Sequence, residues 1–303
     1  MRNQALKAKK QILRTQISNA RTRNNERQLE RALARYFKAL EKQIQRNLQF
    51  YWQDNLVMGQ VDLITEPIMN SHDEYYEILS KFVSREYQLG SNEAERLIHQ
   101  LNRNRVANKS TKPKARAFLK RTFELFGIHA TAEEDLLTRV FIASERTLAR
   151  VDRSIMDIIT LGYKSGNGIN SVANELTRRF DQLTTWESKR IARTEIHNAH
   201  NRGTMDKYQE FGVEYTMWVS AGDDGRTRET HLGPADGVPD GVDGEIIPMG
   251  ETYSNGLQYP GDTNGPIEEW INCRCSNAPY VIPYGYAAPP FSPFREEDLI
   301  KIR

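Results

Sequence analysis

The stretch RIARTEIHNAHNRG, residues 190 to 203, places several side chains that can do acid-base chemistry on one expected helix. A histidine near a carboxylate can act as a general base, and an arginine can stabilise an anionic transition state. One interpretation therefore makes His197 or His200 the base, Glu195 its partner and Arg193 the anion-binding group. This arrangement would suit metal-independent RNA cleavage.

A second interpretation makes the same helix a docking element. Successive helix positions point about 100° apart, so Arg193 and Glu195 do not face one substrate without help from another segment. Polar side chains of buried helices usually bond backbone groups that helices and strands leave unsatisfied. A narrow face of small residues, which would let another backbone approach closely, comprises Ala192, Ile196, Ala199 and Gly203. We favour docking onto C-terminal loops over catalysis.

A possible zinc site is formed by Cys273 and Cys275, the two cysteines of the chain, together with His231. The Cys-x-Cys spacing would put both thiols on one face of a strand, and two sulfurs with one nitrogen suit zinc. A structural site needs a fourth ligand, for which Asp224 and Asp236 are candidates. Otherwise the cysteines are small buried residues.

Three carboxylates could bind a hard cation such as calcium or magnesium. Asp223 and Asp224 lie in DDGRTRETH, and Asp262 lies in PGD at residues 260 to 262. Asp-Gly is first of all a turn signal, so we expect turns at these positions.

The composition indicates a polar chain with at least one real core. The chain has 303 residues, of which 38% are hydrophobic and 27% are charged, and its length favours two domains. We expect no signal peptide and no membrane span, because no apolar run approaches about 20 residues. Two cysteines do not make a disulfide framework, so a reducing compartment fits best.

Hydrophobic periodicity predicts a mainly helical body. The expected helices span residues 25–48, 73–89 with a stop at Gly90, about 91–103, 132–163, 170–180 and 184–211. Ser91 or Asn92 would cap the third of these helices, and Thr184 with Glu187 would form a capping box for the last one. The Lys- and Arg-rich stretch at residues 102–116 contains a proline and is expected to be a linker or loop.

The character of the chain changes after Gly212. VEYTMWVS and NCRCSNAPYVIP are expected strands, and the Gly- and Pro-rich stretch between them disfavours helices. The fold class is therefore α+β, a mainly helical body with a small C-terminal loop-rich β unit.

Charge is divided unevenly along the chain. Residues 1–48 hold 13 Lys and Arg against 3 Glu, whereas residues 221–270 hold 2 Arg against 11 Asp and Glu. Such asymmetry indicates that the basic end meets a polyanion, although a solvated helix face would look similar. The acidic end would be repelled by DNA and more plausibly faces protein.

The order of five motifs resembles one known family. ARTEIHNAHNRG, Trp218, DDGRTRETH, PGD and NCRCSNAPYV together resemble the Mu F-like minor head proteins, or head-morphogenesis family, of tailed double-stranded DNA bacteriophages. The resemblance covers residues 140 to 282, roughly. By resemblance, the structural motif comprises Arg193, Thr194, Glu195, His197, Asn201, Gly203, Asp224, Arg226 and Thr227.

The resemblance implies three regions. Residues 1–130 would be a basic, helical region for portal and DNA contact, residues 131–282 the Mu F-like head-morphogenesis domain, and residues 283–303 a Pro-rich tail. Many relatives carry Cys-x-x-Cys after the DGRT element, where this chain has Arg228 and His231. Three of four possible zinc ligands therefore remain, and we expect no other cofactor.

The resemblance also implies a function without enzymatic activity. We expect a minor capsid protein inside the phage head, assembled in the host cytoplasm, that binds the portal in the procapsid and assists head morphogenesis and genome ejection. Its other partners would be the major capsid or scaffolding protein and double-stranded DNA. The expected DNA-binding residues are Arg21, Arg23, Arg27, Arg31, Arg35, Lys112, Lys114 and Arg116. The alternative is a nuclease or transesterase that uses Arg193, Glu195, His197 and His231.

Overall fold

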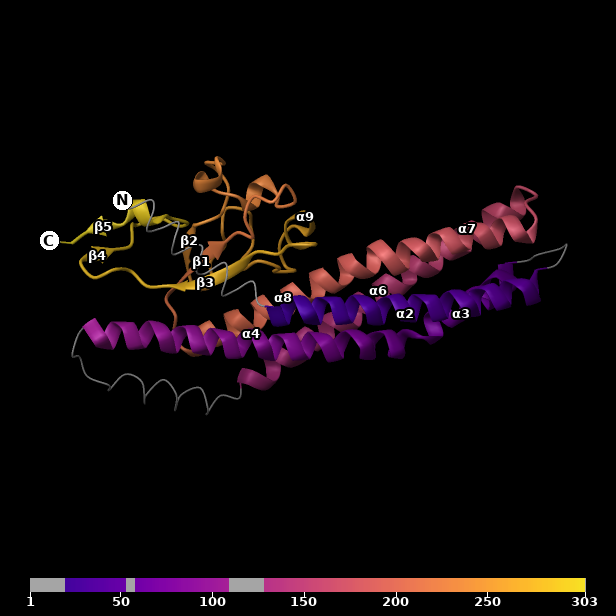
Figure 1. Ribbon diagram of the computed structural model, residues 1–303, viewed down its shortest axis with the longest axis horizontal. Coiled ribbons are helices and arrows are strands. Elements are labelled where there is room, and N and C mark those ends of the chain that lie inside the picture. The colour runs from indigo at the N-terminus through magenta and orange to yellow at the C-terminus, as the bar shows by residue number, and fades with distance from the viewer. Residues whose placement is uncertain (1–19, 53–57, 109–127, 303) are drawn as a thin grey trace. The chain divides into compact units, whose positions relative to one another are not determined.

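The computed structural model describes residues 20–52, 58–108 and 128–302 (Figure 1). Helices dominate, and small antiparallel sheets lie near the C-terminus, which confirms the predicted α+β class. The chain forms two compact units that each draw on segments far apart in sequence, so they cut across the expected boundary at residues 130 and 131. The helical unit comprises Asn25–Val83 and Glu134–Ala192, and the mixed unit comprises Met1–Asn24, Ser84–Glu133 and Arg193–Arg303.

In the described part of the chain, seven helical segments precede the sheet. They are α2 (Ala20–Tyr51), α3 (Met58–Asn70), α4 (His72–Asn108), α6 (Ile128–Lys164), α7 (Ile169–Gln182), a π-helical turn (Leu183–Glu187) and α8 (Ser188–Glu210). Among the described residues, no helix has the length and apolar character needed to cross a bilayer.

The core of the helical unit follows the predicted periodicity. Apolar residues at helical spacing along α2 are buried, as are others on α6 and α7. On α6, Phe141 departs from the expected pattern, because its side chain is 44% exposed. Polar side chains tie the helices together: the Gln45 amide donates to the carbonyl oxygen of Ala173 at 2.9 Å, and Arg179 Nε donates to Ser154 Oγ at 2.9 Å. The buried residues of this core include Leu29, Leu33, Phe37, Ile44, Leu48, Val151, Ile155, Ile159, Val172, Leu176 and Phe180.

The expected helix stop at Gly90 is wrong, because α4 continues unbroken to Asn108 and neither Ser91 nor Asn92 caps a new helix. Gly90 instead permits close packing within the mixed unit. A Cβ atom at Gly90 would lie 2.1 Å from the carbonyl oxygen of His200, and one at Gly203 would lie 2.1 Å from that of Tyr87. These two glycines therefore let the backbones of α4 and α8 come together.

The expected capping box at Thr184 and Glu187 is also wrong. The helix does not restart there, because α7 passes through a π-helical turn into α8. Thr184 Oγ1 donates back to the carbonyl oxygen of Asp181 at 3.1 Å, and the buried Glu187 carboxylate accepts from the guanidinium groups of Arg150 and Arg179. Two arginines thus hold the carboxylate that was expected to bond helix N–H groups.

The mixed unit contains a three-stranded antiparallel sheet with strand order β2-β1-β3. Strands β1 (Tyr215–Val219) and β3 (Ser276–Tyr280) lie within the two predicted strand segments, whereas β2 (Ile246–Pro248) was not anticipated. The cysteines precede β3, so the expectation that they share one face of a strand is wrong. The remaining elements are the 3-10 turns η2 (Glu229–His231), η3 (Pro234–Asp236) and η4 (Glu296–Asp298), the short helix α9 (Ile267–Trp270), and strands β4 (Tyr286–Ala287) and β5 (Ile300–Lys301).

Both faces of β1 are buried, because its side chains alternate between two clusters. Trp218 packs among loop residues and the two cysteines. Met217 and Val219 pack with Ile246 of β2 and with Phe294 of the Pro-rich tail. Ile246 and Phe294 also exchange backbone hydrogen bonds of 2.7 and 3.0 Å, so the tail extends the packing of this sheet.

Gly90→Ala and Gly203→Ala are each expected to destabilise the protein. Alanine in a helix interior normally gains about 1 kcal/mol over glycine, but here each new methyl group would meet a backbone carbonyl, and such overpacking costs about 1–3 kcal/mol. Urea unfolding measures the change against Gln209→Ala, an exposed position of α8 that should be near neutral. Stabilisation by either alanine would contradict the close packing of α4 and α8.

Candidate functional site

Helix α8 lies between α4 and the loops that surround β3 (Figure 1). Thr194, Asn198, Asn201 and Met205 follow one another at spacings of four, three and four residues and therefore share a face. All four side chains are buried. This face of α8 carries the hydrogen bonds to the loops of the mixed unit.

Asn201 and Thr194 bond the loop backbone directly. Asn201 Nδ2 donates to the carbonyl oxygen of Pro260 at 2.7 Å and to that of Cys275 at 2.9 Å. Thr194 Oγ1 accepts from the backbone N–H of Asn272 at 2.9 Å. These side chains satisfy backbone groups that have no strand partner.

Asn198 extends the same set of contacts. In the orientation that satisfies both ends of its amide, Asn198 donates to the carbonyl oxygen of Gly261 at 3.3 Å and to that of Thr194 at 3.0 Å. Gly261 has a φ of 91°, and a Cβ there would lie 2.3 Å from the nearest atom of the Asn198 side-chain amide. The PGD loop therefore needs its glycine both for backbone conformation and for close approach to α8.

The opposite face of α8 contacts α4. His200 Nδ1 lies 3.0 Å from Glu86 Oε1, an oxygen that also accepts from Thr22 Oγ1 at 2.7 Å. His200 Nε2 lies 3.8 Å from a carboxylate oxygen of Glu93. Tyr87 Oη donates to Asp206 Oδ2 at 2.9 Å. The helix is thus held on two sides by polar contacts within the mixed unit.

The residues of the alternative catalytic set lie against other parts of the chain. Glu195 and His200 are buried, at 8% and 5% exposure, and His197 is half-buried. Arg193 Nη1 donates to Asn272 Oδ1 at 3.1 Å. This geometry is what the docking interpretation requires, while the roles assigned to these side chains stay predictions.

The segment Asn272–Cys275, here called the NCRC segment, contacts several partners. Asn272 has a φ of 56°, a left-handed conformation that asparagine tolerates better than most residues. Its N–H and side chain reach α8, while the side chain of Arg274 reaches Asp224 at 2.7 Å. The side chains of Cys273 and Cys275 are buried beside His231.

Asp224 organises the DGRT turn. Its Oδ1 accepts from the N–H of Arg226 at 3.0 Å, from Thr227 Oγ1 at 3.2 Å and from Arg274 Nη2 at 3.0 Å. Partial burial opposes ionisation, but the hydrogen bonds from Arg274 and from the Arg226 backbone outweigh it and lower the pKa of Asp224 from 3.8 to about 2. The three loop-motif residues of the resemblance are therefore joined in one turn, which Arg274 links to the NCRC segment.

The carboxylates considered for a hard cation serve separate turns. Asp262 accepts from the backbone N–H groups of Gln258 and Asn264 at 3.2 and 3.0 Å, and Asp223 accepts from that of Gly225 at 3.4 Å. Among the described residues, Asp223, Asp224 and Asp262 do not come together as a metal-binding group. This arrangement agrees with the turn interpretation.

His231, Cys273 and Cys275 do come together, with their potential ligand atoms within 4.8 Å of one another. His231 Nδ1 lies 3.6 Å from Cys273 Sγ and 3.5 Å from Cys275 Sγ. The hydrogen bond between the two cysteine side chains lowers the pKa of Cys273. The same hydrogen bond, together with burial, raises the pKa of Cys275. Neither Asp224 nor Asp236 joins this group.

Glu269 is the residue of this cluster that sequence analysis missed. Its Oε2 lies 2.8 Å from His231 Nε2 and accepts from Thr230 Oγ1 at 3.0 Å. Glu269 belongs to the four-residue helix α9, whose packing beside His231 no short-range pattern reveals. Both ring nitrogens of His231 are therefore occupied by other side chains.

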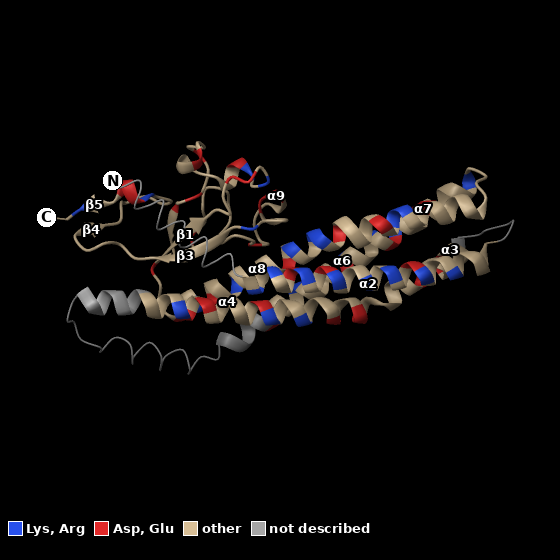
Figure 2. Ribbon diagram, viewed as in Figure 1, with Lys and Arg blue, Asp and Glu red and all other residues tan. Residues whose placement is uncertain are grey.

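The basic residues expected to contact DNA divide into two groups. Arg21, Arg23, Arg27, Arg31 and Arg35 are exposed on α2, whereas Lys112, Lys114 and Arg116 lie outside the described residues. The basic series on α2 continues further than expected, because Lys38, Lys42 and Arg46 are exposed as well. Figure 2 shows Lys and Arg recurring along this helix.

Fold and site together define a mainly helical protein in which the polar helix α8 is hydrogen-bonded to a small, loop-rich β unit. Comparison with known proteins gives this class a family: residues 153–278 match the family described as Phage Mu protein F like protein. Over this region the chain is similar to the Mu F-like family of phage head proteins. No curated protein and no solved structure matches the chain.

Replacing Asn201 is expected to loosen the loops next to α8. Asn201→Ala leaves the buried carbonyl groups of Pro260 and Cys275 without their donor, which costs about 1–3 kcal/mol for an unsatisfied group. Asn201→Asp, which keeps the shape but loses the N–H donors, should cost at least as much. Urea unfolding measures the loss. A change below about 0.5 kcal/mol in both variants would contradict the contribution of these bonds to stability.

The DGRT turn is expected to survive mild acid. Because the pKa of Asp224 is lowered to about 2, the turn's ionic stabilisation is fully present above the ordinary pKa of 3.8 and is lost as the pH falls through about 2. Proton-detected NMR of the Arg226 amide should show its folded resonance at pH 3.5, provided that the fold persists. Loss of that resonance between pH 5 and 4, with the sheet amides unchanged, would contradict the lowered pKa of Asp224.

Proposed function

We propose that the protein is a minor head protein of a tailed phage that binds the portal inside the procapsid and assists head morphogenesis and genome ejection. In this proposal, α2 contacts DNA without reading its sequence. The match to the Mu F-like family over residues 153–278 supports the head role. The exposed basic face of α2 supports the DNA contact and is the observation on which that part of the proposal rests.

The basic face of α2 is continuous. Its members follow one another at spacings of four, four, three, four and four residues, which keeps them within about 100° around the helix. The apolar residues of α2, from Leu29 to Leu48, are buried on the other side. The basic face comprises Arg27, Arg31, Arg35, Lys38, Lys42 and Arg46.

The dimensions of this face suit a phosphate backbone. At about 1.5 Å per residue, the 19 steps from Arg27 to Arg46 span roughly 28 Å. Double-stranded DNA carries one negative charge for about every 1.7 Å of its axis, so a linear row of cations can meet several phosphates. Lys38 forms an ion pair with Glu41 at 2.6 Å, which reduces its expected contribution to phosphate binding.

The acidic part of the mixed unit supports a protein partner. Residues 221–270 carry 11 Asp and Glu against 2 Arg, so DNA would repel this segment. We assign it to contact with the portal or with the major capsid or scaffolding protein, inside the phage head. The same proposal assigns the protein no enzymatic activity.

A triple substitution tests the DNA contact. Arg27→Gln, Arg31→Gln and Arg35→Gln together remove three positive charges from the exposed face of α2 while keeping residues that favour helix. The affinity for duplex DNA should fall, and the slope of log K against log salt should lose up to about 2.7, because each phosphate contact contributes about 0.9. Fluorescence anisotropy with unrelated duplexes at several salt concentrations gives both quantities.

The control carries the same change in charge at another place. Lys164→Gln, Arg178→Gln and Lys189→Gln alter exposed positions of α6, α7 and α8. This variant should keep most of the salt slope of the unchanged protein. Equal losses in the two triple variants would mean that net charge, rather than the face of α2, drives binding, and binding independent of salt would remove the DNA contact altogether.

A further inference from the structure

We propose that His231, Cys273 and Cys275 bind a structural zinc ion that fixes the NCRC segment against α8. The three side chains come from η2 and from the segment that precedes β3, about 40 residues apart in sequence. Their ligand atoms converge on one point in the interior of the mixed unit. This site concerns the mixed unit alone and does not depend on the portal or DNA contacts proposed above.

The distances between the side chains suit a tetrahedral ion. With Zn–S bonds of about 2.3 Å and a Zn–N bond of about 2.0–2.1 Å, tetrahedral geometry separates the nitrogen from each sulfur by roughly 3.5 Å. His231 Nδ1 lies 3.6 Å from Cys273 Sγ and 3.5 Å from Cys275 Sγ. Both nitrogen–sulfur distances therefore match those of a tetrahedral zinc site, and the three ligand atoms lie within 4.8 Å of one another.

Glu269 prepares the imidazole for this role. A metal-binding histidine usually bonds a carboxylate or carbonyl through its other ring nitrogen, which fixes the tautomer and the orientation of the ring. Here Glu269 Oε2 bonds His231 Nε2 at 2.8 Å, so the proton belongs on Nε2 and the lone pair of Nδ1 faces the two sulfurs. Thr230 Oγ1 in turn donates to the carboxylate at 3.0 Å and holds it in place.

The surroundings explain why an ion would stay bound. His231, Cys273 and Cys275 are 1%, 3% and 1% exposed, and the ring of Trp218 packs edge-on against the imidazole with centroids 5.1 Å apart. Two thiolates and one imidazole are soft ligands that favour zinc over magnesium or calcium. Among the described residues, no fourth His, Cys, Asp or Glu joins the group, so a non-protein ligand such as water would complete the coordination.

The ion would stabilise the hydrogen bonds between α8 and the NCRC segment. Cys275 supplies both a thiol to the cluster and the carbonyl oxygen that accepts from Asn201, while Asn272, next to Cys273, donates its N–H to Thr194. A metal that fixes both cysteines therefore also fixes the backbone groups that α8 binds. Because such a site is absent from the unfolded chain, its binding free energy adds to folding stability.

The experiment begins with the full chain purified without chelator or affinity metal. Native mass spectrometry and elemental analysis are expected to find one zinc ion per chain. Removal of the ion with a chelator should lower the Tm, and added zinc should restore it. Cobalt bound to the metal-free protein should give the thiolate-to-metal charge-transfer absorption that only sulfur ligands produce.

Substitutions assign the ion to its ligands. Cys273→Ser and Cys275→Ser should each lose the zinc and the charge-transfer band, and Glu269→Gln should weaken zinc binding by about 10–100-fold through the orientation of His231. Asp224→Asn and Asp236→Asn, which alter acidic residues outside the group, are the matched controls and should keep stoichiometric zinc. The cobalt titration of the unsubstituted protein gives an answer even if a cysteine variant fails to fold.

Three results would overturn the proposal. The first is a folded protein that is isolated without zinc and binds neither zinc nor cobalt through sulfur. The second is zinc retained at full occupancy in both cysteine variants, which would place the ion elsewhere. The third is stoichiometric iron or copper in place of zinc.

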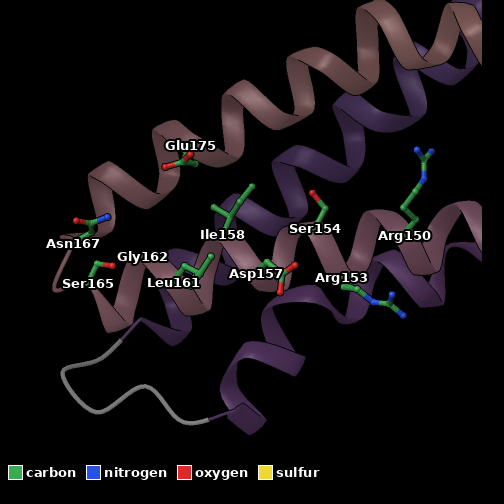
Figure 3. A pocket seen from close by; sticks show the side chains of 10 residues that line it. All are labelled: Arg150, Arg153, Ser154, Asp157, Ile158, Leu161, Gly162, Ser165, Asn167 and Glu175. Carbon is green, nitrogen blue, oxygen red and sulfur yellow. The ribbon is translucent and has the colours of Figure 1, made fainter.

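The helical unit contains a pocket beside α6 and α7. Its cavity measures about 480 Å³ and is lined by α6 and α7 residues of both charges, among them Arg153, Asp157 and Glu175 (Figure 3). Arg150, which also lines it, already pairs with Glu187 at 3.1 Å. Nothing in this lining selects one class of ligand.

Discussion

The hydrogen bonds between the polar face of α8 and the irregular backbone of the mixed unit are the constraint on which this architecture depends. A segment rich in Gly and Pro has many backbone groups that no sheet can pair, and leaving them buried without partners is costly. Thr194, Asn198 and Asn201 bond the backbone at Gly261, Asn272 and Cys275, among others. A helix that would be too polar for an ordinary core thereby becomes one side of the core.

The same constraint explains two features that look unrelated. Helix α8 carries glycine and a buried histidine because its other face must approach α4, where Gly90 and Gly203 permit contact and Glu86 pairs with His200. The NCRC segment lies between α8 and His231, so successive groups along it contact one or the other. Its backbone and Asn272 bind α8, while its thiols lie beside His231. One helix and one short segment thus connect most of the mixed unit.

Much of the fold was predictable from local pattern, and the failures have physical reasons. The periodicity of α2 and α6 and the composition of β1 gave the correct elements, because those signals are local. Gly90 was misread as a stop, since the reason for a glycine inside a helix was a partner more than 100 residues away. The three-residue strand β2 is set by its neighbour β1 and has no signal of its own.

The candidate site was predictable in its residue types but not in its partners. Asn201 and Thr194 were named as motif residues through the family resemblance, yet Pro260, Asn272 and Cys275 could not be assigned to them from spacing. Glu269 was missed for the same reason. The central claim is tested most directly by hydrogen exchange at the Asn272 amide in the unchanged protein and in Thr194→Val. We predict protection that the substitution removes while the amides of β1 and β3 keep theirs; rapid exchange of Asn272 in the unchanged protein, or protection that survives the substitution, would contradict it.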